Sequence, residues 1–496
     1  MSASVICLIS GVVLSLAFPR ADLHWIAWFA LAPLMYYTYR LTWKQALICG
    51  MAFGVGFFGS LLYWIAIFGK FPWVALSIFQ GLFVLAFVAA AKLVGSRLGT
   101  WGRFILLPAL WVAFEWIRSL GMFGFTWGDV GYTQYKVLPV IQIASLTGVW
   151  GVSFLLAASN AALANLAAAR RSSSGLGAAH AQVLLVCLLV VAVVVFGLAS
   201  LRMPVAATGR QVRAAVVQGN VNQDADQDVA YNERVWRTYR AMTSAAAEKG
   251  ADLVVWPETV VPGCLGRDPF IQRRLSALAA VLGAHLLVGA WDEDDGGRVY
   301  NSAFLIGPGS GVLGRYWKVH LVPFGEYVPA RKYMPFLRYY RVTAYDTSPG
   351  PGYNVMEVGD YKLGTAICFE SIFPHISRQL TLSGANLLCV ITNDAWFGQT
   401  SAAEQHMAKS VFRAVENDRY VIRGAATGIS CIIDPRGRIL ARSGLFRRAL
   451  LVHDVWTESD TTFYTRHGDW LVYACLALTL LLAVIASVRR ASGRGV

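Results

Sequence analysis

The stretch Gly364-Thr-Ala-Ile-Cys-Phe-Glu370 ends an apolar β-type run on a cysteine, Cys368, and becomes polar directly afterwards. Two upstream stretches have the same form, since Val254-Val-Trp-Pro-Glu258 ends on a glutamate and Arg315-Tyr-Trp-Lys318 ends on a lysine. Strands of one sheet can bring their ends to a common edge, so we expect the three polar side chains to meet there. A carboxylate, an ammonium group and a thiol in one site indicate acyl-transfer chemistry.

Each of these residues also has a purely structural interpretation. A cysteine on an apolar strand is commonly an inert core residue, and this is how we interpret Cys389. A glutamate after Trp-Pro can cap a turn, and a strand lysine is ordinarily solvated. Cys368 differs because a helix-like stretch follows it, and a helix N-terminus lowers a thiol pKa and offers N–H groups to an oxyanion.

In the functional interpretation, Glu258 takes the thiol proton and later returns it, because a carboxylate in a partly apolar site has a raised pKa. Lys318 stabilises the thiolate and the tetrahedral oxyanion, and Glu326 holds that lysine charged and oriented. The local sequence leaves the structural and functional interpretations open.

Composition divides the chain into two kinds of segment. Of its 496 residues, 56% are hydrophobic and 15% are charged, against about 25% charged in an average soluble protein. The excess of apolar residues lies in 1–201 and 470–488, whereas 202–469 reads as a globular domain large enough to bury its own core. We predict a transmembrane bundle in 1–201, a catalytic domain in 202–460, and a final helix with a tail in 461–496.

A helix that spans a bilayer needs about 20 mostly apolar residues. The runs 182–201 and 470–488 meet this requirement, and six further candidates lie near 3–19, 24–39, 45–69, 71–91, 104–118 and 137–168. We therefore predict seven spans before the domain and one after it. The first run has no basic residue before it, so we expect an uncleaved helix rather than a signal peptide.

Basic residues in the short loops orient the predicted spans. With the N-terminus inside, the inner segments hold Arg40, Lys44, Lys92, Arg97, Arg103, Arg170, Arg171, Arg489, Arg490 and Arg494, and the outer loops hold Arg20, Lys70, Arg118 and Lys136. Seven spans then place the domain outside. The net charge of +14 follows this topology and favours anionic lipid, and its scatter argues against nucleic-acid binding.

The eight cysteines do not form a metal-binding pattern. Four lie in predicted spans as apolar side chains, namely Cys7, Cys49, Cys187 and Cys475. Disulfides are permitted in an outer domain, and a bridge between Cys264 and Cys431 stays open. Without CxxC pairs or Cys/His clusters, we predict no metal and no cofactor.

From residue 212 onward, short β-rich runs alternate with helical stretches. The predicted strands are 213–221, 252–258, 285–290, 301–306, 314–321, 361–368, 387–393, 424–434 and 450–455. The predicted helices are 232–248, 269–282, 373–382 and 402–418. This mixture predicts a layered α/β domain.

Two stretches interrupt this rhythm. The loop 323–352 mixes tyrosines and phenylalanine with arginines and lysine, which suits a bilayer interface or, alternatively, a self-packed surface loop. The turn Asn393-Asp-Ala-Trp-Phe-Gly398 presents two large aromatic side chains just after a predicted strand.

The three catalytic stretches, with 316–329 extending as Tyr-Trp-Lys-Val-His-Leu-Val-Pro-Phe-Gly-Glu-Tyr-Val-Pro, resemble the nitrilase superfamily, whose catalytic residues are Glu, Lys and Cys in that order. The flanking spans narrow the resemblance to the bacterial apolipoprotein N-acyltransferases. Val216-Val-Gln-Gly-Asn220, Thr392–Gly398, Phe123-Gly-Phe-Thr-Trp127 and Gly131-Tyr132 match as well, whereas 338–349 matches weakly. The resemblance implies an αββα sandwich facing the periplasm of a bacterial inner membrane.

The resemblance also implies residue roles. Cys368 is similar to the nucleophile, Glu258 to the general base, Lys318 to the oxyanion stabiliser and Glu326 to its supporting carboxylate. The N–H of Phe369, where such enzymes commonly have tyrosine, is a candidate second oxyanion donor. Candidate substrate contacts are Trp236, Trp396 and Phe397.

The implied reaction is ping-pong. Cys368 attacks the sn-1 ester of a phospholipid, and the α-amine of the diacylglyceryl-cysteine of an apolipoprotein then attacks the thioester. Two alternatives remain at this point: a membrane-tethered amidohydrolase with water as acceptor, and a transporter whose domain only binds. A transport path would require intramembrane charges, and Glu115 near a span end is the main one that we find.

Overall fold

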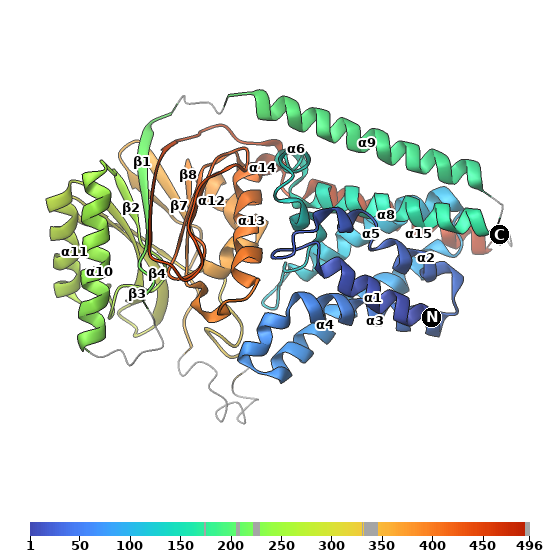
Figure 1. Cartoon of the computed structure of the whole chain (residues 1–496), viewed down its shortest axis with the longest axis horizontal. Coiled ribbons are helices and arrows are strands. Elements are labelled where there is room, and N and C mark those ends of the chain that lie inside the picture. Colours follow the sequence, from blue (N-terminus) through green and yellow to red (C-terminus); the bar gives the residue numbers. More distant parts are fainter. Residues whose placement is uncertain (173–174, 205–208, 222–228, 330, 332–345, 492–496) are drawn as a thin grey trace. The chain divides into compact units, whose positions relative to one another are not determined.

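The computed structural model describes residues 1–172, 175–204, 209–221, 229–329, 331 and 346–491. The chain forms two compact units. The first comprises Met1–Met203, Thr400–Ala408 and His467–Val496, and the second comprises Pro204–Gln399 and Lys409–Arg466 (Figure 1).

The first unit is helical. Its main helices are α1 (Ala3–Ser15), α2 (Ala32–Arg40), α3 (Trp43–Leu61), α4 (Lys70–Gly95), α5 (Thr100–Arg118), α6 (Leu138–Ile141), α7 (Ala144–Thr147), α8 (Val149–Ser172), α9 (Leu176–Arg202) and α15 (Trp470–Ala491). Among the described residues, five of them are long and apolar enough to cross a membrane, namely α3, α4, α8, α9 and α15. The count of eight spans is therefore not confirmed.

Two of the expected spans are wrong as single helices. Residues 24–39 form a 3₁₀ helix (His24–Trp28) followed by the nine-residue α2, and nine residues rise only about 14 Å against about 30 Å of hydrocarbon. Residues 137–168 are divided among α6, α7 and α8, with Gly148 at φ 65° between the last two. Hydropathy alone could not register these breaks, because the average over a window is dominated by the apolar residues on both sides of each break.

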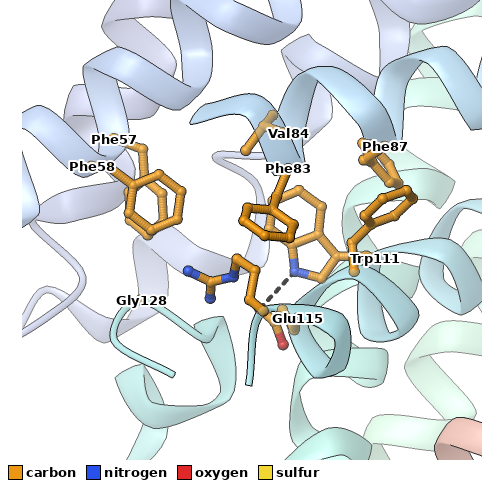
Figure 2. A pocket seen from close by; sticks show the side chains of 10 residues that line it. Phe57, Phe58, Phe83, Val84, Phe87, Trp111, Glu115 and Gly128 are labelled. Atoms are coloured by element: carbon orange, nitrogen blue, oxygen red, sulfur yellow. Dashed lines mark hydrogen bonds between the residues drawn. The ribbon is translucent and has the colours of Figure 1, made fainter. Parts of the chain in front are cut away.

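A buried polar cluster lies at the end of α5. Glu115 Oε1 accepts hydrogen bonds from Trp111 Nε1 and from the backbone N–H of Val130, both at 2.8 Å. Arg118 forms a buried ion pair with Asp129. Figure 2 shows phenylalanine rings around this cluster, beside the bond from Trp111 to Glu115. The sequence identified Glu115 as the main intramembrane charge. The structure places the ion pair of Arg118 and Asp129, whose charges cancel, next to it.

The second unit contains two six-stranded sheets. The first has the order β12 (Ala449–Trp456), β1 (Gln211–Gln218), β2 (Leu253–Val255), β3 (His285–Glu293), β4 (Val299–Gly307), β5 (Gly311–Trp317). The second has the order β11 (Ile439–Arg442), β10 (Cys431–Ile433), β9 (Val421–Ala425), β8 (Leu387–Thr392), β7 (Tyr361–Ile367), β6 (Val355–Val358).

The two sheets pack face to face with helices outside them. A Cβ on Gly424 of β9 would lie 3.2 Å from Val255 Cγ1 of β2, so the sheets are in close contact there. Figure 1 shows α10 (Val229–Glu248) and α11 (Pro269–Leu282) outside the first sheet, with α12 (Pro374–Leu382) and α13 (Ala402–Asn417) beside the second. The expected two-sheet α/β fold is confirmed. A short helix, α14 (Phe463–His467), follows the last strand.

One strand prediction is wrong. Residues 424–434 do not form a single strand, because β9 ends at Ala425 and pairs antiparallel with β10, which begins at Cys431. The turn between them contains Gly428, where any Cβ would lie 2.3 Å from Asp394 Oδ2. The short strands β6 and β11 were not predicted.

Strand direction explains where the functional residues gather. β2 is parallel to β3, and β5 runs the same way because β4 is antiparallel to both β3 and β5. The carboxyl ends of β2 and β5 and the amino end of β4 therefore lie at the same end of the strands of the first sheet. In the second sheet β7 is parallel to β8, so their carboxyl ends are also adjacent.

Candidate active site

Glu258, Lys318 and Cys368 come together in the second unit, but the expectation that one sheet presents all three is wrong, because β2 and β5 belong to the first sheet and β7 to the second. Glu258 follows β2 after Trp256 and Pro257, and Lys318 and Cys368 directly follow β5 and β7. Lys318 Nζ lies 3.4 Å from Glu258 Oε1 and 2.8 Å from Glu326 Oε1. The lysine is 1% exposed and Glu258 is 5% exposed, so these charges interact with little screening by water.

Lys318 stays charged in spite of its burial. Burial has the largest effect on its pKa and lowers it, but the charges of Glu326 and Glu258 raise the pKa above the ordinary lysine value. A fixed ammonium group is therefore present beside the thiol at neutral pH, where it can stabilise developing negative charge.

The thiol of Cys368 is protonated at neutral pH. Its pKa is raised, first by burial and next by the charge of Glu258, while the charge of Lys318 opposes the rise. The expectation that a helix N-terminus lowers this pKa is wrong: a 3₁₀ helix (Cys368–Ile372) and then α12 do follow Cys368, but burial and the charge of Glu258 outweigh any lowering by them. Reaction of this thiol consequently requires a base, and Glu258 is the adjacent carboxylate.

The backbone at Cys368 is strained. Its φ is +53°, in the left-handed region that non-glycine residues rarely adopt. Such strain costs on the order of 1–3 kcal/mol and persists where surrounding contacts determine the conformation. The hydrogen bonds that Glu370 accepts from neighbouring segments, including the N–H of Ile367, hold Cys368 in this conformation.

Glu370 connects the segments that carry Lys318 and Cys368, and the sequence did not reveal this role. Its Oε1 accepts hydrogen bonds from Tyr316 Oη at 2.9 Å and from the N–H groups of Val319 at 2.6 Å and His320 at 3.1 Å. Its Oε2 accepts from the N–H of Ile367 at 2.7 Å. Burial raises the pKa of Glu370 to about 7, although the three backbone hydrogen bonds and the charge of Lys318 lower it.

Asn301 and Asn393 are two more site residues that the sequence did not indicate. Asn301 Nδ2 donates to Glu258 Oε1 at 2.7 Å and to Glu326 Oε1 at 2.9 Å. The N–H of Asn393 donates to Glu258 Oε2 at 2.7 Å, which joins the end of β8 to the end of β2. Asn393 belongs to the turn 393–398 described above. Asn301 lies inside a strand, and no sequence pattern around it marks it as a site residue.

The predicted substrate-contact residues are more dispersed. Trp236 is buried in the core between helices and sheet. Its ring centroid lies 6.1 Å from that of Trp256, and the guanidinium carbon of Arg274 lies 4.1 Å from the Trp236 ring centroid. Trp396 is 63% exposed and Phe397 is half-buried. The Phe369 ring lies 5.2 Å from that of Phe373.

Three other expectations concern the second unit. Within the described part of the chain no disulfide is present, so Cys264 and Cys431 are not bridged. Cys389 is buried on β8, as expected of a core residue. In the loop 323–352, residues 330 and 332–345, with most of its aromatic and basic side chains, lie outside the described residues.

Comparison with known proteins extends over nearly the whole chain. Residues 213–459 match the carbon-nitrogen hydrolase family, and residues 10–162 match the apolipoprotein N-acyltransferase N-terminal domain. An amidase from Nesterenkonia sp. of known structure aligns with 53% of this chain and 95% of its own, at 22% identity and a TM-score of 0.40.

Two full-length relatives share the same name. The apolipoprotein N-acyltransferase of Geobacter metallireducens is 37% identical, covering 98% of this chain and 95% of the relative. That of Chlorobaculum tepidum is 30% identical, covering 97% and 96%. The chain therefore belongs to the apolipoprotein N-acyltransferase family.

Proposed function

We propose that this protein transfers a fatty acyl group from a phospholipid to the N-terminal α-amine of the diacylglyceryl-cysteine of apolipoproteins. The observation that carries this proposal is the buried Lys318, held between the carboxylates of Glu258 and Glu326 in the same site as the Cys368 thiol. Such a site provides a nucleophile, a base and a cation for the oxyanion, which is what acyl transfer requires.

In the first half-reaction, Glu258 accepts the proton of the Cys368 thiol, and the sulfur attacks the sn-1 ester carbonyl. Lys318 and the N–H of Phe369 stabilise the tetrahedral oxyanion. The oxyanion collapses, the C–O bond breaks, and the departing glyceryl oxygen takes the proton from Glu258. The products are a thioester on Cys368 and a lysophospholipid.

In the second half-reaction, the neutral α-amine of the acceptor attacks the thioester carbonyl. Glu258 accepts the amine proton as the C–N bond forms, and the C–S bond then breaks. The proton returns to the sulfur, which restores the thiol and releases an amide. Glu326 keeps Lys318 charged in both steps. Trp236, Trp396 and Phe397 remain candidate substrate contacts, of which the exposed Trp396 is best placed to reach a lipid.

We also propose that the protein spans the bacterial inner membrane eight times, with residues 24–39 crossing as a 3₁₀ helix followed by α2 rather than as one helix. The catalytic domain (202–460) then lies on the periplasmic side, between a bundle (1–201) and a final helix with its tail (461–496). Five helices of sufficient length and the loop charge bias support this arrangement. Both substrates are lipids, so each would arrive by diffusion within the bilayer.

A membrane-tethered amidohydrolase would use the same three residues with water as the acceptor. That alternative accounts for residues 213–459, but it leaves the match of residues 10–162 to an acyltransferase N-terminal domain unexplained. Acyl transfer is therefore the function that we favour.

Intact-mass spectrometry tests the proposal. Incubation of the purified full-length protein with phospholipid vesicles should add one fatty acyl mass to Cys368, and addition of a diacylated lipopeptide should remove it as triacylated product. Release of free fatty acid at the same rate with and without the lipopeptide would instead support hydrolysis.

A further inference from the structure

We propose that Asn301 is a positioning residue for Glu258, and that its hydrogen bond commits the other carboxylate oxygen, Oε2, to proton transfer with the thiol. The proposal rests on the proposed function, since it concerns how the base of that reaction is oriented. It goes further by naming the atom that carries the proton and a residue that selects it.

Asn301 reaches the site through the register of the first sheet. It lies near the start of β4, and its carbonyl oxygen accepts the N–H of Lys318 at 2.9 Å, so the two residues are opposite each other. Its side chain is 2% exposed. Nδ2 donates to Glu258 Oε1 and Glu326 Oε1, and Lys318 Nζ donates to the same two oxygens. Two donors and two acceptors thus close a ring.

The orientation of the amide is determined by this ring. With the amide reversed, Asn301 Oδ1 would face two carboxylate oxygens, which is repulsive. In the observed orientation Oδ1 is buried without a hydrogen-bond partner among the described residues. A buried unpaired acceptor is costly, and a residue that served only packing would avoid it.

Counting acceptor sites then distinguishes the two oxygens of Glu258. Each carboxylate oxygen offers about two lone-pair directions. Oε1 receives Asn301 Nδ2 at 2.7 Å and Lys318 Nζ at 3.4 Å, so both of its directions are occupied. Oε2 receives one described bond, from the N–H of Asn393 at 2.7 Å. The remaining direction of Oε2 is where a thiol proton can be accepted.

The charges around Asn301 provide a way to test this role. The groups that face its amide are the carboxylates of Glu258 and Glu326 and the ammonium of Lys318. The other titratable groups of the site are the Cys368 thiol, Asp394, whose charge acts on that thiol, and Glu370 and His320, which both interact with Lys318. Substitution Asn301→Asp adds a third carboxylate to the ring. One bound proton restores the original charge, and loss of that proton at higher pH places an extra negative charge beside the developing oxyanion.

The experiment measures the rate of acyl-adduct formation on Cys368 from phosphatidylethanolamine vesicles, by intact mass, between pH 6 and pH 9. The proteins are the full-length wild type, Asn301→Asp, and the uncharged Asn301→Leu. We expect the rate of Asn301→Asp relative to wild type to fall at least about tenfold from pH 6 to pH 9. We expect Asn301→Leu to be slower by about 10- to 100-fold, by a factor that does not change with pH.

The possible outcomes distinguish failure of the role proposed for Asn301 from failure of the proposed function. An adduct in the wild type together with a pH-independent ratio for Asn301→Asp would overturn the role of Asn301, as would an Asn301→Leu rate within threefold of wild type. Failure of the wild type itself to form an adduct would instead overturn the proposed function. If Asn301→Asp does not fold, the rate of Asn301→Leu still decides the proposal.

Discussion

Substitution Lys318→Met removes the ammonium group that lies between the carboxylates of Glu258 and Glu326. At an effective dielectric constant of about 20, an ammonium 2.8 Å from one carboxylate and 3.4 Å from another is attracted by roughly 6 and 5 kcal/mol. Desolvation offsets much of this attraction, and removal of one partner from a buried charge cluster typically costs about 3–5 kcal/mol of stability.

The variant should lose activity for two reasons. Without the ammonium group the carboxylates of Glu258 and Glu326 would repel each other, which would displace Glu258 from its position as a base. The oxyanion would also lose a donor that is typically worth about 10²- to 10³-fold in rate. We therefore expect acyl-adduct formation on Cys368 to fall at least about 10³-fold, with the melting temperature lowered. Lys318→Arg should not restore it, because the 1% exposed site has no room for a guanidinium.

Lys362→Met is the matched control. Lys362 also pairs with a glutamate, Glu357, at 2.6 Å, but both side chains of that pair are exposed. Exposed pairs contribute about 0–1 kcal/mol, so stability and acylation should be nearly unchanged. A Lys318→Met protein that forms the adduct within tenfold of the wild-type rate would refute the assigned role of the ammonium group.

Cys368→Ser should abolish adduct formation without unfolding the protein, because a hydroxyl is harder to deprotonate than a thiol; normal transfer by this variant, measured with lipopeptide, would contradict the nucleophile assignment. Burial raises the pKa of Glu370 from 4.5 to about 7, so the folded state keeps a proton that the unfolded chain has lost. This group should therefore lower stability by up to about 3 kcal/mol as pH rises from about 4.5 to 7, a dependence that denaturant titration should find missing in Glu370→Gln. A reporter fused within 202–469 should be active only outside the cytoplasm, and cytoplasmic activity would contradict the predicted topology.

The two sheets show how far a local pattern extends. Apolar runs bounded by polar turns located most strands of the domain, because a buried strand must be apolar along its own length. The same rule joined β9 and β10 into one strand, since the turn between them, residues 426–430, contains no charged residue to mark it. What separates them is the close approach of Asp394 to Gly428, a contact between residues distant in sequence.

The helices of the first unit show the same contrast between what a local sequence pattern predicts and what contacts distant in sequence decide. Hydropathy identified the apolar segments, but α2 and the pieces α6 and α7 are shorter than any span. Their ends depend on how each segment packs against its neighbours, and a sliding average of hydropathy does not contain that information.

By itself, the sequence determined which chemical groups end the strands: Glu258, Lys318 and Cys368 offer a candidate base, cation and nucleophile, and the resemblance to the nitrilase superfamily made a reaction class the expected interpretation. Only the tertiary structure decided how those groups are held. Asn301 and Glu370 reach the site through strand register and contacts between the two sheets, which no local window contains. The structure also reversed the expected effect on the thiol, because burial beside Glu258 raises its pKa more than the charge of Lys318 lowers it.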